Sequence, residues 1–275
     1  MTDHYAVVGN PVAHSISPQI HAEFARQTGQ DLDYVKLPAL ADAFETTVRK
    51  FRDAGGKGVN VTLPFKYAAW NFVDDCHGYA LDAEAVNTIE FRDSGMIGHN
   101  TDGIGLVTDF EQNLEFPIRG KRVLLMGSGG ATYGVMQPLL ETRPDLLVIA
   151  NRTLVKAERL VAHFQQFEKL VPRGVSAQPY EALAGSQFDL VINATSAGLR
   201  DEMPALPAAI FAPGALAYDM VYGRQTPFMK FAREHDAARS CDGLGMLVEQ
   251  AAASFFIWRG VRPATAPVIA LLRRR

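Results

Sequence analysis

Short apolar runs alternate with amphipathic stretches along the first part of the chain, and this alternation predicts strands joined by helices. Gly9, Asn10 and Pro11 end the first apolar run, and Ser17 and Pro18 are the expected N-cap and first residue of the next helix. The expected elements are strands at 4–8, 33–38 and 58–61, helices at 17–28 and 42–51, and a hairpin with strands at 85–91 and 96–100. Strands connected mainly by helices are typical of an α/β domain.

A second block of the same kind follows a boundary near residues 100–105. Its apolar runs are short and nearly continuous, as in a parallel sheet that helices cover on both faces. The expected elements are strands at 122–126, 146–150, 188–193 and 216–220, helices at 131–140 and 153–164, and a long helix at 244–258. The predicted fold class is therefore α/β with two domains, and the default ligand site is a cleft at the carboxyl ends of the strands.

Composition narrows the function mainly by exclusion. The 275 residues include 27 Lys and Arg and 30 Asp and Glu, a net charge of −3, so no basic excess indicates nucleic-acid binding. The two cysteines, Cys76 and Cys241, have neither disulfide-framework nor zinc spacing, which favours a reduced, cytoplasmic setting. We expect no secretory signal and no metal site. We also expect no membrane segment, because Glu249 and Gln250 interrupt the richest late apolar stretch.

A glycine-rich loop connects the strand at 122–126 to the helix at 131–140. Glycines in this context let the backbone approach a pyrophosphate, and the helix N-terminus offers free N–H groups. Thr132 occupies the third small position of the usual motif, so the match is imperfect, and a tight turn without a ligand is the alternative. The loop residues are Gly127, Ser128, Gly129, Gly130 and Ala131.

The end of the next strand indicates which dinucleotide would bind. A free ribose 2′-hydroxyl usually meets an acidic residue there, but this chain has Asn151, Arg152 and Thr153, with Lys156 one turn later. A guanidinium can hold phosphate oxygens in a fork, so these residues favour NADP over NAD. The alternative is a helix N-cap at Thr153 beside two solvated basic residues.

Polar side chains also gather after the strands of the first block. Ser15 and Ser17 are candidates to bind a carboxylate, or they only cap the helix. Lys66 and Asp102 are candidates for a proton-transfer pair, whereas a solvated surface lysine is the alternative. The neighbouring polar residues are Thr62, Asn87, Asn100 and Thr101.

An ordered set of motifs gives the chain a specific resemblance. The segments are 9–18, 60–66, 85–88, 100–103, 127–131, 151–153, 193–196, 218–222 and 242–250. With these motifs the chain resembles the shikimate dehydrogenases of the aromatic amino-acid pathway, which reduce 3-dehydroshikimate to shikimate with NADPH. The resemblance implies a substrate-binding domain with a mostly parallel sheet over 1–102, a Rossmann-like NADP-binding domain over 103–242, and a C-terminal helical segment over 243–275 that returns to the first domain. It also implies a monomer or a homodimer.

The resemblance assigns roles to individual residues. Lys66 would deliver a proton to the carbonyl oxygen with Asp102 as its partner, or would act as an electrostatic clamp on the developing oxyanion. Ser15 and Ser17 would hold the substrate carboxylate. The residues around the substrate ring would be Thr62, Lys66, Asn87, Asp102, Tyr222 and Gln250. NADP would contact Gly127, Ser128, Gly129, Gly130, Ala131, Asn151, Arg152, Thr153, Lys156, Thr195, Met220 and Gly243.

Two departures and three alternatives qualify this interpretation. Tyr133 stands where many relatives have an arginine, and Glu84 stands where a glycine is common. An NAD-using quinate/shikimate dehydrogenase is disfavoured by Arg152. A non-catalytic shikimate-binding sensor could lose Lys66 and Asp102, which this chain keeps. A folate-linked dehydrogenase is disfavoured by the pair of serines.

Overall fold

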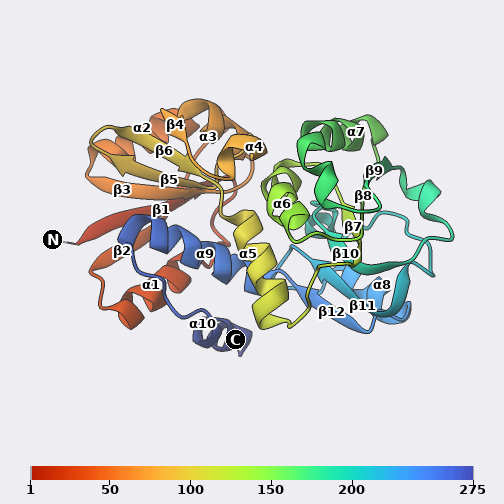
Figure 1. Cartoon of the computed structure of the whole chain (residues 1–275). Helices are drawn as coiled ribbons and strands as arrows, with labels where there is room; N and C mark the ends of the chain where they lie inside the picture. The colour runs from red at the N-terminus through yellow and green to blue at the C-terminus, as the bar shows by residue number, and fades with distance from the viewer. Residues whose placement is uncertain (1, 275) are drawn as a thin grey trace. The chain divides into compact units, whose positions relative to one another are not determined.

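The computed structural model describes residues 2–274, which form two compact units. The first unit takes the chain up to Leu106 and again from Leu247 onward, and the second is Val107–Met246. Figure 1 shows the elements of both units by label. Within the described residues, no helix has the length and apolar character that crossing a membrane requires.

The first unit is built on a mixed sheet of six strands within the described residues. The strands are β1 (Asp3–Gly9), β2 (Leu32–Pro38), β3 (Gly56–Val61), β4 (Asp75–Cys76), β5 (Thr88–Arg92) and β6 (Gly95–His99), in the order β2-β1-β3-β5-β6-β4. Among these described strands, β5 is the one that runs opposite to the rest. The sheet is thus mostly parallel, as expected, and the hairpin is present.

Helices cover both faces of this sheet (Figure 1). The helices that belong wholly or partly to this unit are α1 (Ser17–Thr28), α2 (Phe44–Asp53), α3 (Lys66–Phe72), α4 (Ala80–Ala83), α5 (Asp102–Thr108), α9 (Leu244–Arg259) and α10 (Ala266–Arg273). Helix α1 packs on β1 and β2, and α2 packs on β3. Most of α9 belongs to this first unit although it follows the second unit in sequence. The predicted return of the C-terminal helix to the first domain is therefore confirmed.

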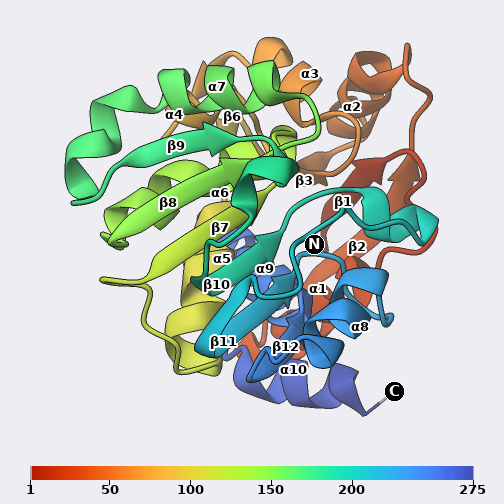
Figure 2. The same ribbon diagram turned by 90° about the vertical axis from the view of Figure 1, so that its right-hand side faces the viewer.

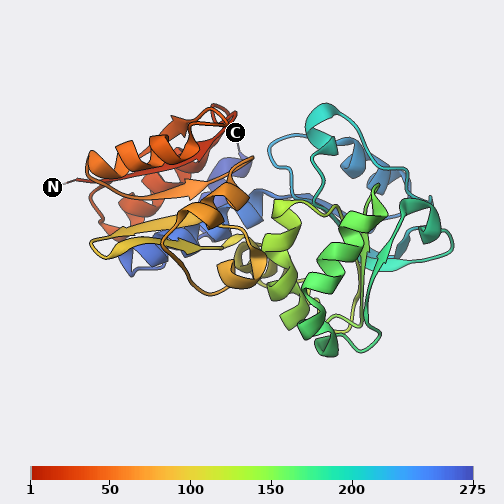
Figure 3. The ribbon, with the colours of Figure 1, turned by 90° about the horizontal axis from the view of Figure 1, so that it is seen from above.

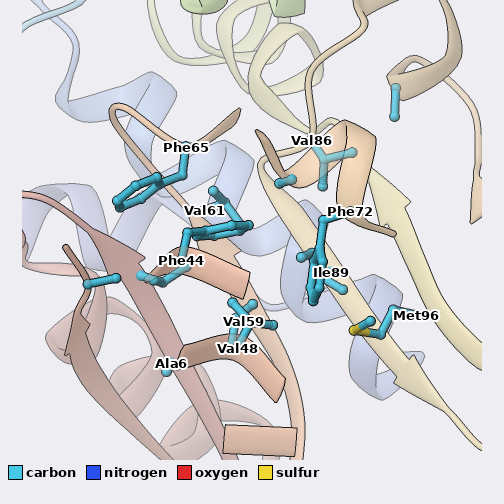
Figure 4. Close-up of a cluster of buried hydrophobic side chains, with 14 residues drawn as sticks. Ala6, Phe44, Val48, Val59, Val61, Phe65, Phe72, Val86, Ile89 and Met96 are labelled. Carbon is cyan, nitrogen blue, oxygen red and sulfur yellow. The ribbon is translucent and has the colours of Figure 1, made fainter. Parts of the chain in front are cut away.

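Alternation along β1 supplies the core on both faces of the sheet. Ala6 and Val8 belong to a cluster with residues of α2 and α3, whereas Tyr5 and Val7 pack on the opposite side with Tyr34. Figure 4 shows the first cluster, where the rings of Phe44 and Phe65 stack with centroids 4.9 Å apart. Members of this cluster from the central strands include Val59, Val61 and Ile89. Their burial fixes the register of the strands that carry the site.

The second unit has a parallel sheet, seen with its strands side by side in Figure 2. Its described strands are β7 (Arg122–Met126), β8 (Leu146–Ala150), β9 (Val175–Gln178), β10 (Phe188–Asn193), β11 (Phe211–Asp219) and β12 (Arg239–Asp242), in the order β12-β11-β10-β7-β8-β9. The helices are α6 (Gly130–Glu141), α7 (Leu154–His163) and α8 (Pro227–Glu234), with α6 and α7 next to each other in Figure 3. Shorter turns are η1 (Asp109–Asn113), η2 (Gln165–Leu170), η3 (Tyr180–Leu183) and η4 (Ala197–Arg200). This is the expected Rossmann-like arrangement.

Several local predictions were wrong. Ile16, not Ser17, is the N-cap of α1, and its side chain makes no capping hydrogen bond. The first strand of the hairpin begins at Thr88 rather than at residue 85, and Lys66 is the first residue of α3, a helix that was not predicted. The elements missed altogether are short or polar: β4, β9, β12, α3, α4, α8 and α10. Sequence periodicity is weakest for such elements, because few side chains define each face.

A buried histidine makes the stability of the first unit depend on pH. His21 is 1% exposed, and its ring stacks on that of Tyr34 with centroids 4.1 Å apart. Burial lowers the pKa of His21 from 6.5 to about 3, although an interaction with Asn60 opposes part of the shift. Below pH 6.5 the imidazole of His21 therefore binds a proton in the unfolded chain but stays neutral in the folded protein. The free energy of unfolding keeps its full value above pH 6.5 and falls as the pH is lowered toward 3.

We expect the free energy of unfolding to fall by about 2.5 kcal/mol from this group between pH 7 and pH 4.5. In His21→Phe, which keeps an aromatic ring on Tyr34, this part of the pH dependence should disappear. Urea unfolding at several pH values in both proteins measures the difference. An equal loss of stability in wild type and His21→Phe would contradict the assignment.

Candidate active site

The topology of the first sheet brings several polar segments to one edge. Strand β1 lies between the parallel strands β2 and β3, so the segments after β1 and β3 leave from the same edge. Because β5 is antiparallel to β3 and to β6, the segment before β5 and the segment after β6 also lie at this edge. These segments carry Ser15 and Ser17, Thr62 and Lys66, Asn87, and Asp102.

Lys66 and Asp102 form a direct ion pair at this edge. The Nζ of Lys66 donates to Oδ2 of Asp102 over 2.5 Å, and the two side chains are 14% and 6% exposed. The Nδ2 of Asn87 donates to the other carboxylate oxygen over 2.9 Å. Asp102 is thereby fixed on both oxygens, and the lysine ammonium is held in a mostly buried position. A held ammonium of this kind can give up a proton or stabilise negative charge.

Gln250 reaches the same group from α9. Its Oε1 accepts hydrogen bonds from Asn87 Nδ2 over 3.3 Å and from Thr101 Oγ1 over 3.4 Å. A residue from the end of the chain therefore joins residues next to β5 and α5 within one unit. The structure brings together Lys66, Asn87, Asp102 and Gln250 of the expected substrate residues.

Ser15 and Ser17 form a second polar group. The hydroxyl of Ser15 donates to Ser17 Oγ over 3.1 Å and accepts from the peptide N–H of Ser17 over 3.2 Å. The hydroxyl of Ser17 also interacts with Tyr34, whose pKa burial raises well above its ordinary value. Two hydroxyls at the start of a helix suit a carboxylate.

Thr62 is held at the end of β3 by a close approach to β1. Its peptide N–H donates to the carbonyl of Val8 over 2.9 Å. A Cβ on Gly9 would lie 2.4 Å from Thr62 Cγ2, so only a glycine fits between the two segments. Tyr222, the remaining residue expected around the substrate, lies in the second unit just beyond β11.

A buried hydrogen-bond layer beneath these residues was not predicted. The amide of Asn60 accepts from Tyr34 Oη over 2.7 Å and donates to Ser254 Oγ over 2.9 Å. Thr88 and Thr101 each lie within hydrogen-bond distance of the Ser254 hydroxyl as well. Asn60 and Thr101 belong to motifs that can be recognised in the sequence. Ser254 is a single polar residue in an apolar helix, and its sequence context does not indicate this role. These hydrogen bonds help to orient Asn87 and Gln250.

The loop after β7 in the second unit has the properties that a pyrophosphate site needs. Chain order reverses between β7 and β10, which is where ligands bind in such sheets. Gly127 has a φ of +105°, and a Cβ on it would lie 3.2 Å from Thr195 Cγ2, so this glycine is required by the fold. Gly129 and Gly130 have open space where a Cβ would stand, so internal packing does not explain them. Their bare backbone at the N-terminus of α6 fits a dinucleotide.

The segment after β8 presents cations beside this loop. Arg152, Thr153 and Lys156 are exposed, and Thr153 is the N-cap of α7 without a capping side-chain hydrogen bond. Asn151 Nδ2 donates to the carbonyl of Thr153 over 2.9 Å, which shapes the turn. Burial raises the pKa of Tyr180 to about 12, and the positive charge of Arg152 opposes this shift. Exposed cations at this strand end suit a 2′-phosphate.

Asp219 organises the ends of β10 and β11. It is fully buried and accepts hydrogen bonds from Asn193 Nδ2 over 3.0 Å and from Thr226 Oγ1 over 2.6 Å. Asn193 Oδ1 in turn accepts from the hydroxyl of Thr195 over 2.7 Å. Burial raises the pKa of Asp219, and the hydrogen bonds it accepts oppose the shift. Asp219 stands within the motif at 218–222, but its sequence context does not indicate this role.

The two departures from the family pattern have local structural consequences. The ring of Tyr133 packs near those of His163 and Phe164, with centroids 5.5 and 6.1 Å away. Glu84 has a φ of +46°, the left-handed region that favours glycine. Neither residue belongs to the hydrogen-bonded groups described above. Within the described part of the chain, no three side chains are placed to hold a metal ion.

Family models match most of the chain. The model of the shikimate dehydrogenase substrate binding domain matches residues 7–89, and the model of shikimate / quinate 5-dehydrogenase matches residues 110–200. The model of the shikimate 5′-dehydrogenase C-terminal domain matches residues 243–273.

Individual relatives match over nearly their whole length. The shikimate dehydrogenase (NADP(+)) of Methylobacillus flagellatus is 55% identical over 271 residues, which cover 98% of this chain and 99% of the relative. The solved structure of an Ael1 enzyme from Pseudomonas putida has 46% identity and a TM-score of 0.91, with 98% of each chain covered. The shikimate 5-dehydrogenase of Thermus thermophilus, solved with NADP(H) and shikimate, has 31% identity and a TM-score of 0.87, with 99% of each chain covered. With models matching both units and a relative this similar from end to end, the chain belongs to the shikimate dehydrogenase family.

Proposed function

We propose that the protein catalyses the reversible NADPH-dependent reduction of 3-dehydroshikimate to shikimate, a step of chorismate and aromatic amino-acid biosynthesis. The observation that carries this proposal is the buried Lys66–Asp102 pair at the edge of the first sheet, where Asn87 donates to Asp102 and also to Gln250. In this proposal residues 1–102 bind substrate, residues 103–242 bind NADP, and residues 243–275 complete the substrate site. The substrate and cofactor named for the relative from Thermus thermophilus support it.

NADP fits the residues of the second unit. Gly127 to Ala131 would hold the pyrophosphate, Arg152 and Lys156 the 2′-phosphate, and Met220 with Gly243 would lie beside the nicotinamide. Bound NADPH supplies a hydride to the carbonyl carbon. Further contacts would come from Asn151, Thr153 and Thr195.

The chain's own residues account for the rest of the reduction. Ser15 and Ser17 would fix the carboxylate, and Thr62, Tyr222 and Gln250 would surround the ring. Lys66 would give its proton to the carbonyl oxygen as the new C–H bond forms, which turns the carbonyl into the hydroxyl of shikimate. Asp102 holds the ammonium in place, and Asn87 holds Asp102. In the reverse direction the neutral amine would take the hydroxyl proton.

The proposal is tested by following NADPH absorbance with shikimate and NADP⁺, and again with NAD⁺ and with quinate. We expect turnover with shikimate and NADP⁺, and much weaker turnover with NAD⁺ or quinate. If activity with NAD⁺ or with quinate equals that with NADP⁺ and shikimate, the protein is instead a quinate/shikimate dehydrogenase of broad specificity. The matched family model also names this activity. Binding of shikimate without turnover would indicate a sensor.

The sequence spacing of Cys76 and Cys241, which fits neither a disulfide framework nor a zinc site, supports a reduced, cytoplasmic location for this activity.

A further inference from the structure

A buried carboxylate that the proposed reaction does not use lies at the start of the π-helix η1. Asp109 is 1% exposed, and its Oδ2 accepts a hydrogen bond of 2.6 Å from the hydroxyl of Tyr218. Its Oδ1 accepts from Nδ2 of Asn113 over 3.0 Å. Because η1 follows α5 directly, the change from α to π winding sets the direction in which Asp109 points. Such a buried charge is costly unless its hydrogen bonds are kept.

Asp109 and Tyr218 together meet the first turn of α9. A Cβ on Gly245 would lie 1.9 Å from Asp109 Oδ1, so the carboxylate rests directly on the backbone of this turn. The backbone of Met246 lies near enough to the Tyr218 hydroxyl to lower its pKa, against the larger effect of burial. Negative charge and acceptors are favourable at a helix N-terminus, where N–H groups lack partners within the helix. The pair therefore adds to the Asp242 carboxylate, whose Oδ1 accepts from the peptide N–H of Leu244 over 3.4 Å at the start of α9.

The same turn is joined to the end of β11. The peptide N–H of Gly243 donates to the carbonyl of Val221 over 3.1 Å. A Cβ on Gly243 would lie 2.4 Å from the carbonyl oxygen of Met220, so these two backbones are in direct contact. Tyr218 stands on β11 just before this contact. The position of Met220 relative to Gly243 thus depends on how the first turn of α9, up to Met246, is held against the end of β11 within the second unit.

We propose that Asp109 and Tyr218 are positioning residues that lock the first turn of α9 to the end of β11 and so fix Met220 and Gly243, the residues assigned to the nicotinamide. This inference rests on the proposed function for its meaning, since it concerns the cofactor side of the same reaction. Neither residue touches the reacting atoms. Their effect is exerted through the backbone contact between Gly243 and Met220.

Tyr218→Phe tests the proposal because it removes one hydroxyl and keeps the ring that packs on Phe110, 4.7 Å away between centroids. The variant loses the hydrogen bond that Tyr218 donates to the buried Asp109, so we expect the dissociation constant of NADPH to rise about tenfold. The deuterium isotope effect on kcat, measured with NADPH labelled at the transferred position, should also increase. Shikimate affinity without cofactor should stay within about twofold of wild type.

A second variant and a packing control complete the experiment. Asp109→Asn keeps the shape and an acceptor for Tyr218 but removes the charge at the start of α9, and we expect a smaller change in the same direction. Phe110→Leu disturbs the neighbouring core without removing any of these hydrogen bonds, so it should lower the Tm and leave the NADPH dissociation constant near wild type.

The inference is overturned if Tyr218→Phe and Asp109→Asn behave like Phe110→Leu, with a lower Tm but wild-type NADPH affinity and isotope effect. NADPH affinity is measured by direct fluorescence titration, so this comparison holds even without turnover. An inactive wild-type protein that binds NADPH tightly, with weaker binding in Tyr218→Phe, would reject the proposed reaction and keep the positioning role.

Discussion

Replacing Lys66 with methionine is expected to lower kcat for shikimate oxidation by about a thousandfold, while the dissociation constant of NADP⁺ stays within about twofold of wild type. The methionine side chain has a similar length but can neither exchange a proton nor carry charge. Lys66 lies in the first unit and the expected cofactor residues lie in the second, so cofactor affinity should be nearly independent of it. Stopped-flow and steady-state rates, with fluorescence titration of the cofactor, measure both quantities.

Lys66→Arg separates the two roles that remain open for this residue. Arginine keeps the positive charge, but its proton is held too strongly for exchange near neutral pH. If Lys66 is a proton donor, Lys66→Arg should be about as inactive as Lys66→Met. If Lys66 is an electrostatic clamp, Lys66→Arg should keep much of the wild-type activity. A kcat within about tenfold of wild type in Lys66→Met would contradict both roles.

The strands that carry the site could be predicted because their signal is local. The run Arg122–Met126 is apolar on both faces, which marks a central parallel strand, and the glycine loop follows directly. Likewise, the polar residues after β1, β3 and β6 could be expected to meet, since the carboxyl ends of such strands share an edge. The convergence of Gln250 with Asn87 was implied only by the family resemblance.

The residues that support the site could not be predicted, because their roles depend on tertiary contacts. Ser254 stands in an apolar helix, and only the packing of α9 on the sheet shows that its hydroxyl faces Asn60. Similarly, nothing local in Asp109–Asn113 distinguishes a π-helix from the continuation of α5. Phe255 and Phe256 are neighbours in the apolar helix α9, yet Phe255 is buried and Phe256 is 51% exposed, because the two side chains leave α9 in different directions.

Removing both cations after β8, in the double variant Arg152→Ala with Lys156→Ala, is expected to lower kcat/KM for NADP⁺ by about a hundredfold. Hydrogen bonds from a cation to phosphate oxygens are the strong, charge-assisted kind, so each lost side chain contributes about a factor of ten. NAD⁺ lacks the 2′-phosphate, and its kcat/KM should change by less than about threefold. Steady-state rates with shikimate and each dinucleotide give the ratio directly.

The control is a double variant with the same change in net charge, Arg119→Ala with Arg143→Ala. Both arginines are exposed and precede β7 and β8, at the amino ends of these strands rather than at the carboxyl ends where the glycine loop lies. A loss for NADP⁺ in this control would show that the effect comes from overall charge. Equal losses for NADP⁺ and NAD⁺ in the first double variant would show that Arg152 and Lys156 do not read the 2′-phosphate. The assignment is supported only if kcat/KM falls for NADP⁺ and not for NAD⁺, and only in the variant of Arg152 and Lys156. The two double variants remove the same charge, so they differ only in where that charge lies in the second unit.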